Sequence, residues 1–391
     1  APNTRVESVP LSSFFGYTTQ GLFDVRAYYD HDANRWLMSA DAFAESTTVQ
    51  RFFFAVSQTA DPLGSYYIYN VNVSDDLGTT GGVEWDFPQM GLDHNAVIFT
   101  ANFFDSAGNF AGARMFAVPK SLLYSGSTAT LTPHIFTGLL GTLTPPVVLD
   151  TNPNTYLLAA NNGDNKVSLY TLTNSAANPP TLSGPATIPV PAYLVPPNAP
   201  QPGTSTYVID TSDARFVNAS TQIGNSLFQV HTISIGGYAR PRFYEFDPVN
   251  LAVRQSGTFS RSSTSYDFNA SIAANRRHDL VVTWSATDPT NGVNAEVRFS
   301  GRLVSDPPGV IPSPGSLLYG STTFLSGNAQ VDSIQRWGDY SAVSFDPADP
   351  RGATAWIVNE RILGSAIWGS RIGAVVLPNC LPAAYLLLLM D

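Results

Sequence analysis

Apolar residues along this chain occur in short runs and almost never with the 3.6-residue period of an amphipathic helix. The runs are rich in β-branched and aromatic residues and are bounded by Gly, Pro, Asn or Asp, which is the pattern of β-strands. The clearest runs are residues 51–56, 66–73, 96–101, 155–172, 226–235 and 280–284. We therefore predict an all-β protein with minimal helix.

One pattern recurs six times along the chain: an inner strand, a tight polar turn and an apolar strand. The copies begin near residues 23, 85, 145, 213, 266 and 337. The turns recur about every 63 residues between Asp30 and Asp346, enough chain for four antiparallel strands, or one blade of a β-propeller. A blade cannot bury both faces of its sheet alone, so the repeats must stack and close into a ring.

We accordingly predict a six-bladed β-propeller of four-stranded antiparallel blades over residues 1–377, with seven blades as the alternative. The N-terminal stretch up to Gly21 and residues 371–377 would supply strands that close one blade. The proline-rich stretch 178–203 is expected to be an exposed loop between blades. Residues 378–391 are an apolar C-terminal tail, either a closing strand, the start of a trimmed anchor or sequence outside the domain.

Composition narrows the class of protein. The formal net charge of −10 argues against nucleic-acid binding, which needs a basic face. The single cysteine, Cys380, excludes an intramolecular disulfide and a cysteine-ligated zinc site. Lysine occurs only at Lys120 and Lys166, so Ser, Thr, Asn and Gln must supply much of the polar surface, as in many secreted proteins. With no leader and no run long enough to span a bilayer, we expect an extracellular or cell-surface protein whose signal peptide has been removed.

Aspartates near the start of the inner strand are the sharpest candidate for a site. In a propeller the inner strands line the central channel, so like positions gather at one mouth. Carboxylates gathered there repel each other, which raises at least one pKa toward the range that a general acid uses. The structural alternative is that each aspartate accepts backbone N–H groups and locks its blade in place. The aspartates, found in five of the six copies, are Asp24, Asp86, Asp213, Asp267 and Asp339.

Arginines and aromatic residues accompany these carboxylates. Arg26, Arg215 and Arg336 lie within three residues of one of the aspartates, and Arg302 is near in the repeat plan. A guanidinium group offers a bidentate fork for the carboxylate of an acidic sugar, unless it is already paired with the aspartate beside it. The aromatic residues at the expected mouth, which would either stack on a sugar ring or belong to the core, are Trp85, Trp337 and Tyr340.

Metal-binding signals are sparse. His31, His94 and His278 fall in turns on one rim of the expected propeller, as metal ligands or as solvated turn residues. Residues 30–34 have the Asp-x-Asp-x-Asn pattern of a calcium loop but lack its following Gly and distant Glu. We predict no metal and no cofactor, with calcium at 30–34 as the one alternative.

Four segments carry a family resemblance: residues 85–93, 301–309, the hexapeptide Arg336-Trp337-Gly338-Asp339-Tyr340-Ser341, and 356–360. They resemble secreted bacterial β-propeller proteins near the sialidase-like superfamily, and the resemblance runs from about Phe23 to Arg371. The resemblance implies the fold and secretion. The Ser-x-Asp-x-Gly-x-Thr-Trp boxes of sialidase blades are absent from this chain.

Sialidases use an arginine triad, a Tyr–Glu nucleophile pair and an Asp acid/base. The roles that the resemblance implies are substrate clamp for Arg26, Arg302 and Arg336, nucleophile for Tyr340, its base for Glu360 or Glu245, and acid for Asp86 or Asp24.

Three functions fit the sequence. One is a glycan-active hydrolase or lyase acting at the channel mouth through the carboxylate, arginine and tyrosine cluster. The second is a non-catalytic extracellular module that binds a glycan or a protein, since a fold does not dictate an activity. The third is a structural cell-surface or matrix protein that associates with itself. The sequence favours the carbohydrate-related function, with the other two as alternatives, and it does not identify the substrate.

Overall fold

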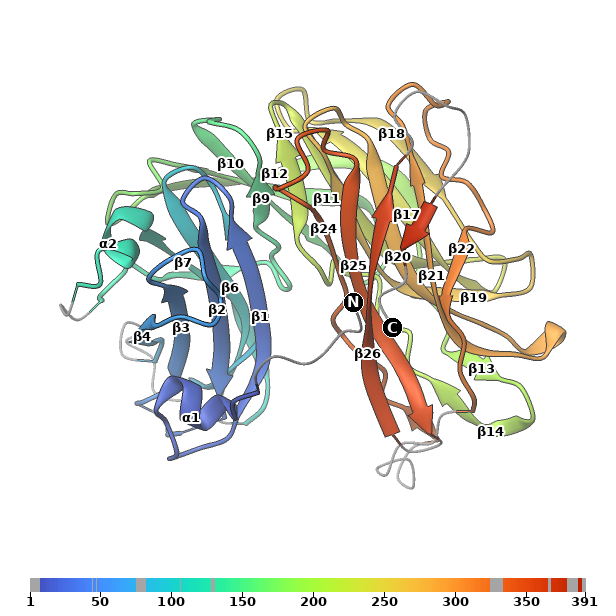
Figure 1. Ribbon diagram of the computed structural model, residues 1–391, viewed down its shortest axis with the longest axis horizontal. Helices are drawn as coiled ribbons and strands as arrows, with labels where there is room; N and C mark the ends of the chain where they lie inside the picture. The colour runs from blue at the N-terminus through green and yellow to red at the C-terminus, as the bar shows by residue number, and fades with distance from the viewer. Residues whose placement is uncertain are drawn as a thin grey trace. The chain divides into compact units, whose positions relative to one another are not determined.

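The computed structural model describes residues 8–43, 45–46, 48–74, 82–105, 107–127, 131–323, 333–364, 367–377 and 386–388 (Figure 1). Strands dominate, and the α-helices in this part of the chain are the short α1 (Leu11–Phe15) and α2 (Lys120–Tyr124). Contacts divide the chain into two compact units. The N-terminal unit is Thr4–Ala159 with Leu169–Ala186, and the C-terminal unit contains Ala160–Ser168 and Thr187–Asp391.

Antiparallel meanders build most of the N-terminal unit, because within each meander a strand pairs with the next one along the chain. The first sheet consists of β1 (Leu22–Asp30), β2 (Arg35–Ala42), β3 (Arg51–Ser57) and β4 (Tyr66–Asn72). The second contains β5 (Gly82–Leu92), β6 (Ala96–Asp105), β7 (Phe110–Pro119) and β8 (Phe136–Leu139), with β9 (Pro146–Val148) parallel to β5. A third consists of β10 (Asn154–Ala160), β11 (Asp164–Thr173) and β12 (Thr181–Tyr193), whose residues are divided between the units.

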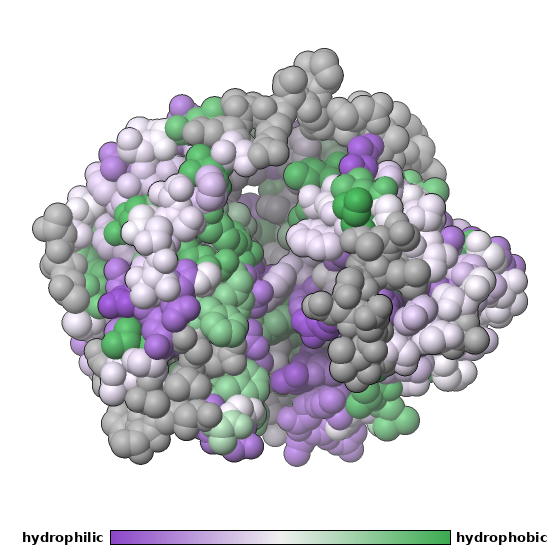
Figure 2. All heavy atoms as spheres, turned by 90° about the horizontal axis from the view of Figure 1, so that it is seen from below, coloured by the Kyte–Doolittle hydropathy of each residue, from purple (hydrophilic) through white to green (hydrophobic). Residues whose placement is uncertain are grey.

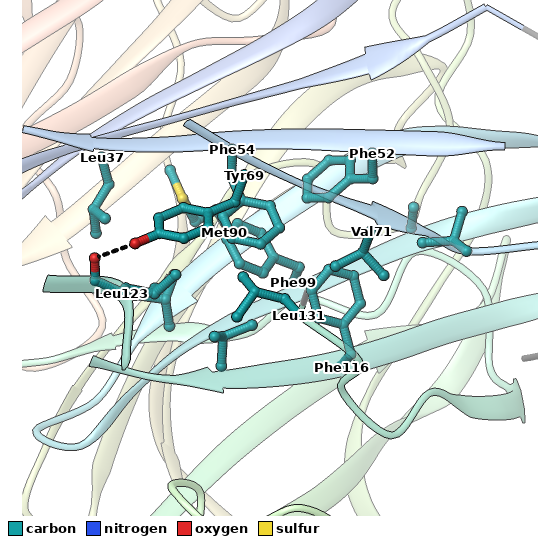
Figure 3. Close-up of a cluster of buried hydrophobic side chains, with 14 of the residues drawn as sticks. Leu37, Phe52, Phe54, Tyr69, Val71, Met90, Phe99, Phe116, Leu123 and Leu131 are labelled. Atoms are coloured by element: carbon teal, nitrogen blue, oxygen red, sulfur yellow. Dashed lines mark hydrogen bonds between the residues drawn. The ribbon is translucent and has the colours of Figure 1, made fainter. Parts of the chain in front are cut away.

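The first two sheets of the N-terminal unit share an aromatic core (Figure 3). Phe52 and Phe54 alternate with Phe53 along β3 and so lie on one face of their sheet. Both contact Phe99 of β6, with ring centroids 5.1 and 4.9 Å away. The Tyr69 hydroxyl donates to the Leu123 carbonyl oxygen at 2.8 Å, which satisfies its polar end inside the core and connects α2 to β4.

The C-terminal unit repeats the meander. Its first sheet has β15 (Ser220–Ile223), β16 (Ser226–Ile235), β17 (Tyr238–Asp247) and β18 (Ala252–Thr258) in sequential order. The next has β19 (Tyr266–Ala274), β20 (Leu280–Asp288), β21 (Val293–Arg302) and β22 (Ser316–Tyr319), and the last has β24 (Ala342–Phe345), β25 (Thr354–Gly364), β26 (Ile367–Val376) and β27 (Leu386–Leu388). A small sheet contains β13 (Ala199–Gln201), β14 (Thr204–Ile209) and β23 (Ile334–Gln335). Val281, Phe299, Ile357 and Val375 belong to one core between the β19–β22 and β24–β27 sheets.

Three first strands share a local irregularity. In β1, β5 and β19 the register against the next strand shifts at a residue with positive φ, as in a β-bulge. These residues are Asp24 (φ 51°), Phe87 (φ 56°) and Asn269 (φ 48°). Six positions after each, a side-chain oxygen accepts backbone N–H groups of the hairpin turn, and the acceptors are Asp30, Asp93 and Asn275. Asp86 and Asp267 lie one and two residues before their left-handed positions, so the recurring aspartates of the sequence are not equivalent.

The all-β prediction is confirmed, and residues 226–235 coincide with β16. The run 155–172 contains two strands, β10 and β11, because a turn at 161–163 divides it. The prediction of a loop over 178–203 is wrong, since β12 fills Thr181–Tyr193. This strand lies at a sheet edge, and its prolines Pro185, Pro189 and Pro191 are all exposed and share one parity. An edge strand tolerates proline at positions whose N–H would point away from its partner.

The expected sharing of one sheet by both chain ends is also wrong for the described residues. All four strands of the last sheet come from residues 342–388. The N-terminal stretch instead forms α1, whose Phe15 packs with Tyr17 and with Phe53 of β3. β27 pairs with β26, as the closing-strand interpretation of the tail predicts, whereas residues 378–385 and 389–391 lie outside the described part. Ring closure and the number of blades stay predictions.

Hydrophobic side chains are scattered in patches among hydrophilic ones on the face shown in Figure 2. No helix in the described ranges is both long and apolar enough to cross a bilayer.

Candidate functional site

Two of the expected catalytic residues, Asp339 and Glu360, come together in the C-terminal unit. Glu360 lies on β25, and Asp339 lies in the segment that leads into β24. A backbone hydrogen bond connects Gly338 to the Glu360 carboxyl group. A Cβ atom at Gly338 would overlap Oε2 of Glu360, so glycine is the residue that permits this approach.

The two carboxyl groups have different surroundings. Burial raises the pKa of Glu360 to about 7, the Gly338 hydrogen bond opposes this rise, and the negative charge of Asp339 adds to it. Asp339 is 27% exposed and accepts a hydrogen bond at 2.7 Å from Nη2 of the exposed Arg336, with which it forms an ion pair. One carboxyl therefore titrates near neutral pH while its neighbour is ion-paired with an arginine, which is the asymmetry that acid–base catalysis uses.

Asn269, at the left-handed position of β19, fixes the backbone of the carboxylate segment. Its Nδ2 donates to the Gly338 carbonyl oxygen at 3.0 Å, and its own carbonyl oxygen accepts from Ser341 Oγ at 3.0 Å. Ser341 Oγ also lies 2.7 Å from Ser271 Oγ of β19. Gly338 is thus held on one side by Asn269 and on the other by Glu360.

A second connection runs through Trp337, which is 3% exposed. Its Nε1 donates to Ser285 Oγ at 3.0 Å, and Ser285 Oγ donates to Asn359 Oδ1 at 3.3 Å. Asn359 precedes Glu360 on β25, and its Oδ1 also accepts the Glu360 backbone N–H at 2.8 Å. This chain of bonds positions the backbone on both sides of the carboxyl pair.

Two buried polar atoms of this network have no hydrogen-bond partner among the described residues: Asn269 Oδ1 and Asn359 Nδ2. Both side chains are almost fully buried. An unpaired buried polar group costs about 1–3 kcal/mol, so such atoms in a folded protein call for a ligand, a water molecule or a function. No sequence motif marks either residue, apart from the adjacency of Asn359 to Glu360.

Asp267 has the contacts that the locking interpretation predicts. Its Oδ2 accepts from Arg240 Nη1 and Ser265 Oγ, both at 2.6 Å. Its Oδ1 accepts from the Arg261 N–H and from Trp284 Nε1, both at 2.8 Å. Burial raises the pKa of Asp267 and these donors oppose the rise. Four donors use the acceptor capacity of a carboxylate, which leaves none for a ligand.

The other expected aspartates have partners of their own. Asp213 precedes β15 and pairs with Arg215, whose Nε donates to Oδ2 at 2.7 Å and whose N–H donates to Oδ1 at 2.8 Å. Asp24 and Asp86 belong to the N-terminal unit, and each has an interaction partner. Trp85 of that unit is fully buried against Phe52 and Phe116, so it belongs to the core.

The three arginines of the expected clamp have separate partners. Arg26 Nε donates to the Pro88 carbonyl oxygen at 2.9 Å within the N-terminal unit. In the C-terminal unit Arg302 donates to Gln255 Oε1 and to the Asp306 carbonyl oxygen, both at 2.8 Å, whereas Arg336 pairs with Asp339. None of these acceptors is shared.

Tyr340 is half-buried beside Asp339 and has its own partners. Its alternative base, Glu245, accepts from Ser226 Oγ and Gln255 Nε2, both at 2.6 Å, and lies 3.7 Å from His278 Nδ1. Glu245 is therefore engaged within the β15–β18 sheet and its surroundings.

In the calcium-like loop at residues 30–34, the Asp30 carboxylate is paired with the ammonium group of Lys120. Asp30 Oδ2 lies 2.7 Å from Lys120 Nζ and accepts from the Tyr124 hydroxyl. Although burial acts to raise the pKa of Asp30, the Lys120 ammonium and these hydrogen bonds lower it below its usual range. Asp32 faces His31 at 3.1 Å and His94 at 3.7 Å. No cluster of three or more His, Cys, Asp or Glu in the described residues has the arrangement of a metal site.

No protein-family model matches this chain, and no curated protein matches it. Among solved structures it is similar to an endo-arabinase from Bacteroides thetaiotaomicron, with 12% identity over 96% of this chain and 98% of that chain and a TM-score of 0.37. An α-L-arabinofuranosidase from Lactobacillus brevis matches with 11% identity over 90% and 89% of the two chains, at a TM-score of 0.35. A protein of unknown function from Dyadobacter fermentans matches with 8% identity over 95% and 83%, at 0.37. Similarities at this level establish neither a family nor an activity for the chain.

Proposed function

We propose that this chain is a secreted, glycan-active β-propeller hydrolase whose reaction takes place at the Asp339–Glu360 pair. The observation that carries the proposal is the pairing of two unlike carboxyl groups: Glu360, whose pKa burial raises to about 7, and Asp339, which is ion-paired with Arg336. Glycoside hydrolysis needs such a pair, one group to give a proton and one to take a proton.

In the proposed reaction Glu360 gives its proton to the glycosidic oxygen as the C–O bond of the anomeric carbon breaks. Water attacks that carbon, and Asp339 accepts the proton that the water releases. The hydroxyl of the water stays on one sugar and the proton of Glu360 stays on the other, so atoms and charge balance. The orphaned Nδ2 of Asn359 and Oδ1 of Asn269 supply a buried donor and acceptor in the same network.

The test is release of reducing sugar from a panel of polysaccharides, together with chromogenic aryl glycosides. We expect Glu360→Gln and Asp339→Asn to lower kcat about 100-fold or more, in line with the loss of a general acid or base. The matched control is Asp61→Asn, an exposed turn carboxylate of the N-terminal unit, which should keep full activity. Retained activity in Glu360→Gln would overturn the assignment.

A non-catalytic binding module is the second candidate, because Asp267 and Asp213 are both saturated by arginine and backbone donors. It predicts glycan or protein binding with no turnover by the unmodified protein. The same panel separates the two functions.

A further inference from the structure

Trp368 on β26 differs from the tryptophans that the sequence placed at a site. Its side chain is 68% exposed, whereas Trp85 and Trp337 are buried. Its flat apolar face is available as a surface on which the C–H face of a sugar ring can stack.

The strand register places Trp368 near Glu360. In the β25–β26 hairpin Glu360 pairs with Ser370 and Ile362 pairs with Trp368 (Figure 1). Directly paired residues of antiparallel strands lie on one face of the sheet, and positions two apart on a strand share that face. Trp368 is therefore the diagonal neighbour of Glu360, a relation in which Cα atoms are separated by about 7–8 Å.

Ser370, which pairs with Glu360 and lies two positions from Trp368, has too small a side chain to block a ligand on this face. Ser370 is exposed and small, and its hydroxyl can donate to or accept from a sugar hydroxyl. Ile372, two positions further along, is also exposed and continues the same row on β26. An exposed row of Trp368, Ser370 and Ile372 thus runs beside the strand that carries Glu360.

The partners of the nearby arginines indicate whether the site favours an acidic or a neutral sugar. The arginines that would hold an acidic sugar already have acceptors: Arg302 binds Gln255 and Asp306, and Arg336 binds Asp339. The site therefore favours a neutral sugar.

We propose that Trp368 is the stacking platform for a ring of a neutral glycan, bound next to the ring on which Glu360 and Asp339 act. This inference rests on the proposed function, from which it takes the position of the reacting bond. It assigns the face formed by Trp368 and Ser370 as the substrate-binding surface.

The test measures binding without turnover in a Glu360→Gln background. The probes are soluble arabinoxylan, galactan and mixed-linkage β-glucan as neutral glycans, and polygalacturonate as the acidic one, each by isothermal titration and affinity electrophoresis. Adding Trp368→Ala should weaken binding of the neutral glycan about tenfold or more, whereas Trp368→Phe, which keeps an aromatic face, should restore most of it. Ile367→Ala is the matched control, because Ile367 is the equally exposed neighbour on the same strand and points to the other face.

Each outcome decides between the two proposals. Binding that Trp368→Ala leaves unchanged, or tighter binding of polygalacturonate, overturns the platform while the hydrolase stands. Turnover of aryl glycosides by the unmodified protein with no binding of any polysaccharide does the same. If Trp368→Ala alters only self-association in light scattering, the surface is an interface between copies and the platform is refuted. If the unmodified protein neither binds nor hydrolyses any probe, the hydrolase fails and the platform fails with it.

Discussion

Folding shifts the pKa of His231 downward and the pKa of Glu360 upward. The two groups therefore change the free energy of unfolding with pH in opposite directions. His231 lies on β16, where its Nδ1 is 2.8 Å from the Ala214 carbonyl oxygen and its Nε2 is 3.1 Å from the Tyr244 hydroxyl. Burial lowers its pKa from 6.5 to about 3. Between those values the unfolded chain binds a proton that the folded chain does not, so the free energy of unfolding falls as the pH falls below 6.5.

Glu360 acts in the other sense. Its folded-state pKa of about 7 lies above the ordinary 4.5, so between these values the folded chain holds a proton that the unfolded chain lacks. Stability from this group therefore increases as the pH falls from 7 to 4.5. Each group contributes about 1.4 kcal/mol per pH unit, or about 2.7 kcal/mol between pH 6.5 and 4.5, with opposite sign.

The perturbation is to remove one group at a time. Relative to the unmodified protein, Glu360→Gln should lose about 2–3 kcal/mol of unfolding free energy between pH 6.5 and 4.5, and His231→Gln should gain a similar amount. Urea unfolding followed by tryptophan fluorescence at several pH values measures both, and the titrating groups that do not interact with the replaced side chain cancel in the difference. Parallel pH profiles for the three proteins would refute the argument that these side chains are buried with shifted pKa values.

Three further changes test other parts of the structure. Asp267→Asn leaves Arg240 buried without its charge partner and should lower the free energy of unfolding by about 3 kcal/mol or more. Asp213→Asn, at a partly exposed ion pair, should lower it by only about 0–1 kcal/mol. Equal losses in denaturant titrations would contradict the locking role. Gly338→Ala should displace the Glu360 carboxyl and remove the Gly338 hydrogen bond that holds its pKa down, so the alkaline limb of the activity profile should move to higher pH. An unmoved limb counts against the contact. Phe99→Ala should lower the free energy of unfolding by about 3–5 kcal/mol. Phe110→Ala, on the exposed part of β7, should change it by about 0.5 kcal/mol at most. Similar melting temperatures for the two variants would disprove the core assignment.

Strand positions were predictable because local pattern decides them when one face is buried. The hairpin turns after Asp30 and Asp93 were visible because Asp and Asn accept the N–H groups of their own turn. Local sequence does not predict the conformation of a segment when tertiary packing determines that conformation. The tetrapeptide Ser-Leu-Leu-Tyr is helical at 121–124 in α2 and extended at 316–319 in β22.

The candidate site shows the same division. The hexapeptide that starts at Arg336 pointed to Asp339, and Glu360 follows on the next hairpin. The partners of this segment, Asn269 and Ser285, lie more than 50 residues earlier, and only the pairing of whole sheets brings them to Gly338 and Trp337. The locking role of Asp267 was one of the two roles expected for the recurring aspartates, but its partner Arg240 could not be identified from local sequence, because Arg240 comes from a different sheet.

The prolines of β12 have a consequence for solubility. An unpaired sheet edge is a template on which strands of other molecules can add and grow into aggregates. Pro185, Pro189 and Pro191 occupy exposed positions of that edge and have no N–H to offer an incoming strand. The same residues that hid this strand from sequence analysis therefore protect the folded chain against intermolecular β-pairing. Replacing them with valine would strengthen the local strand signal and create an aggregation-prone edge.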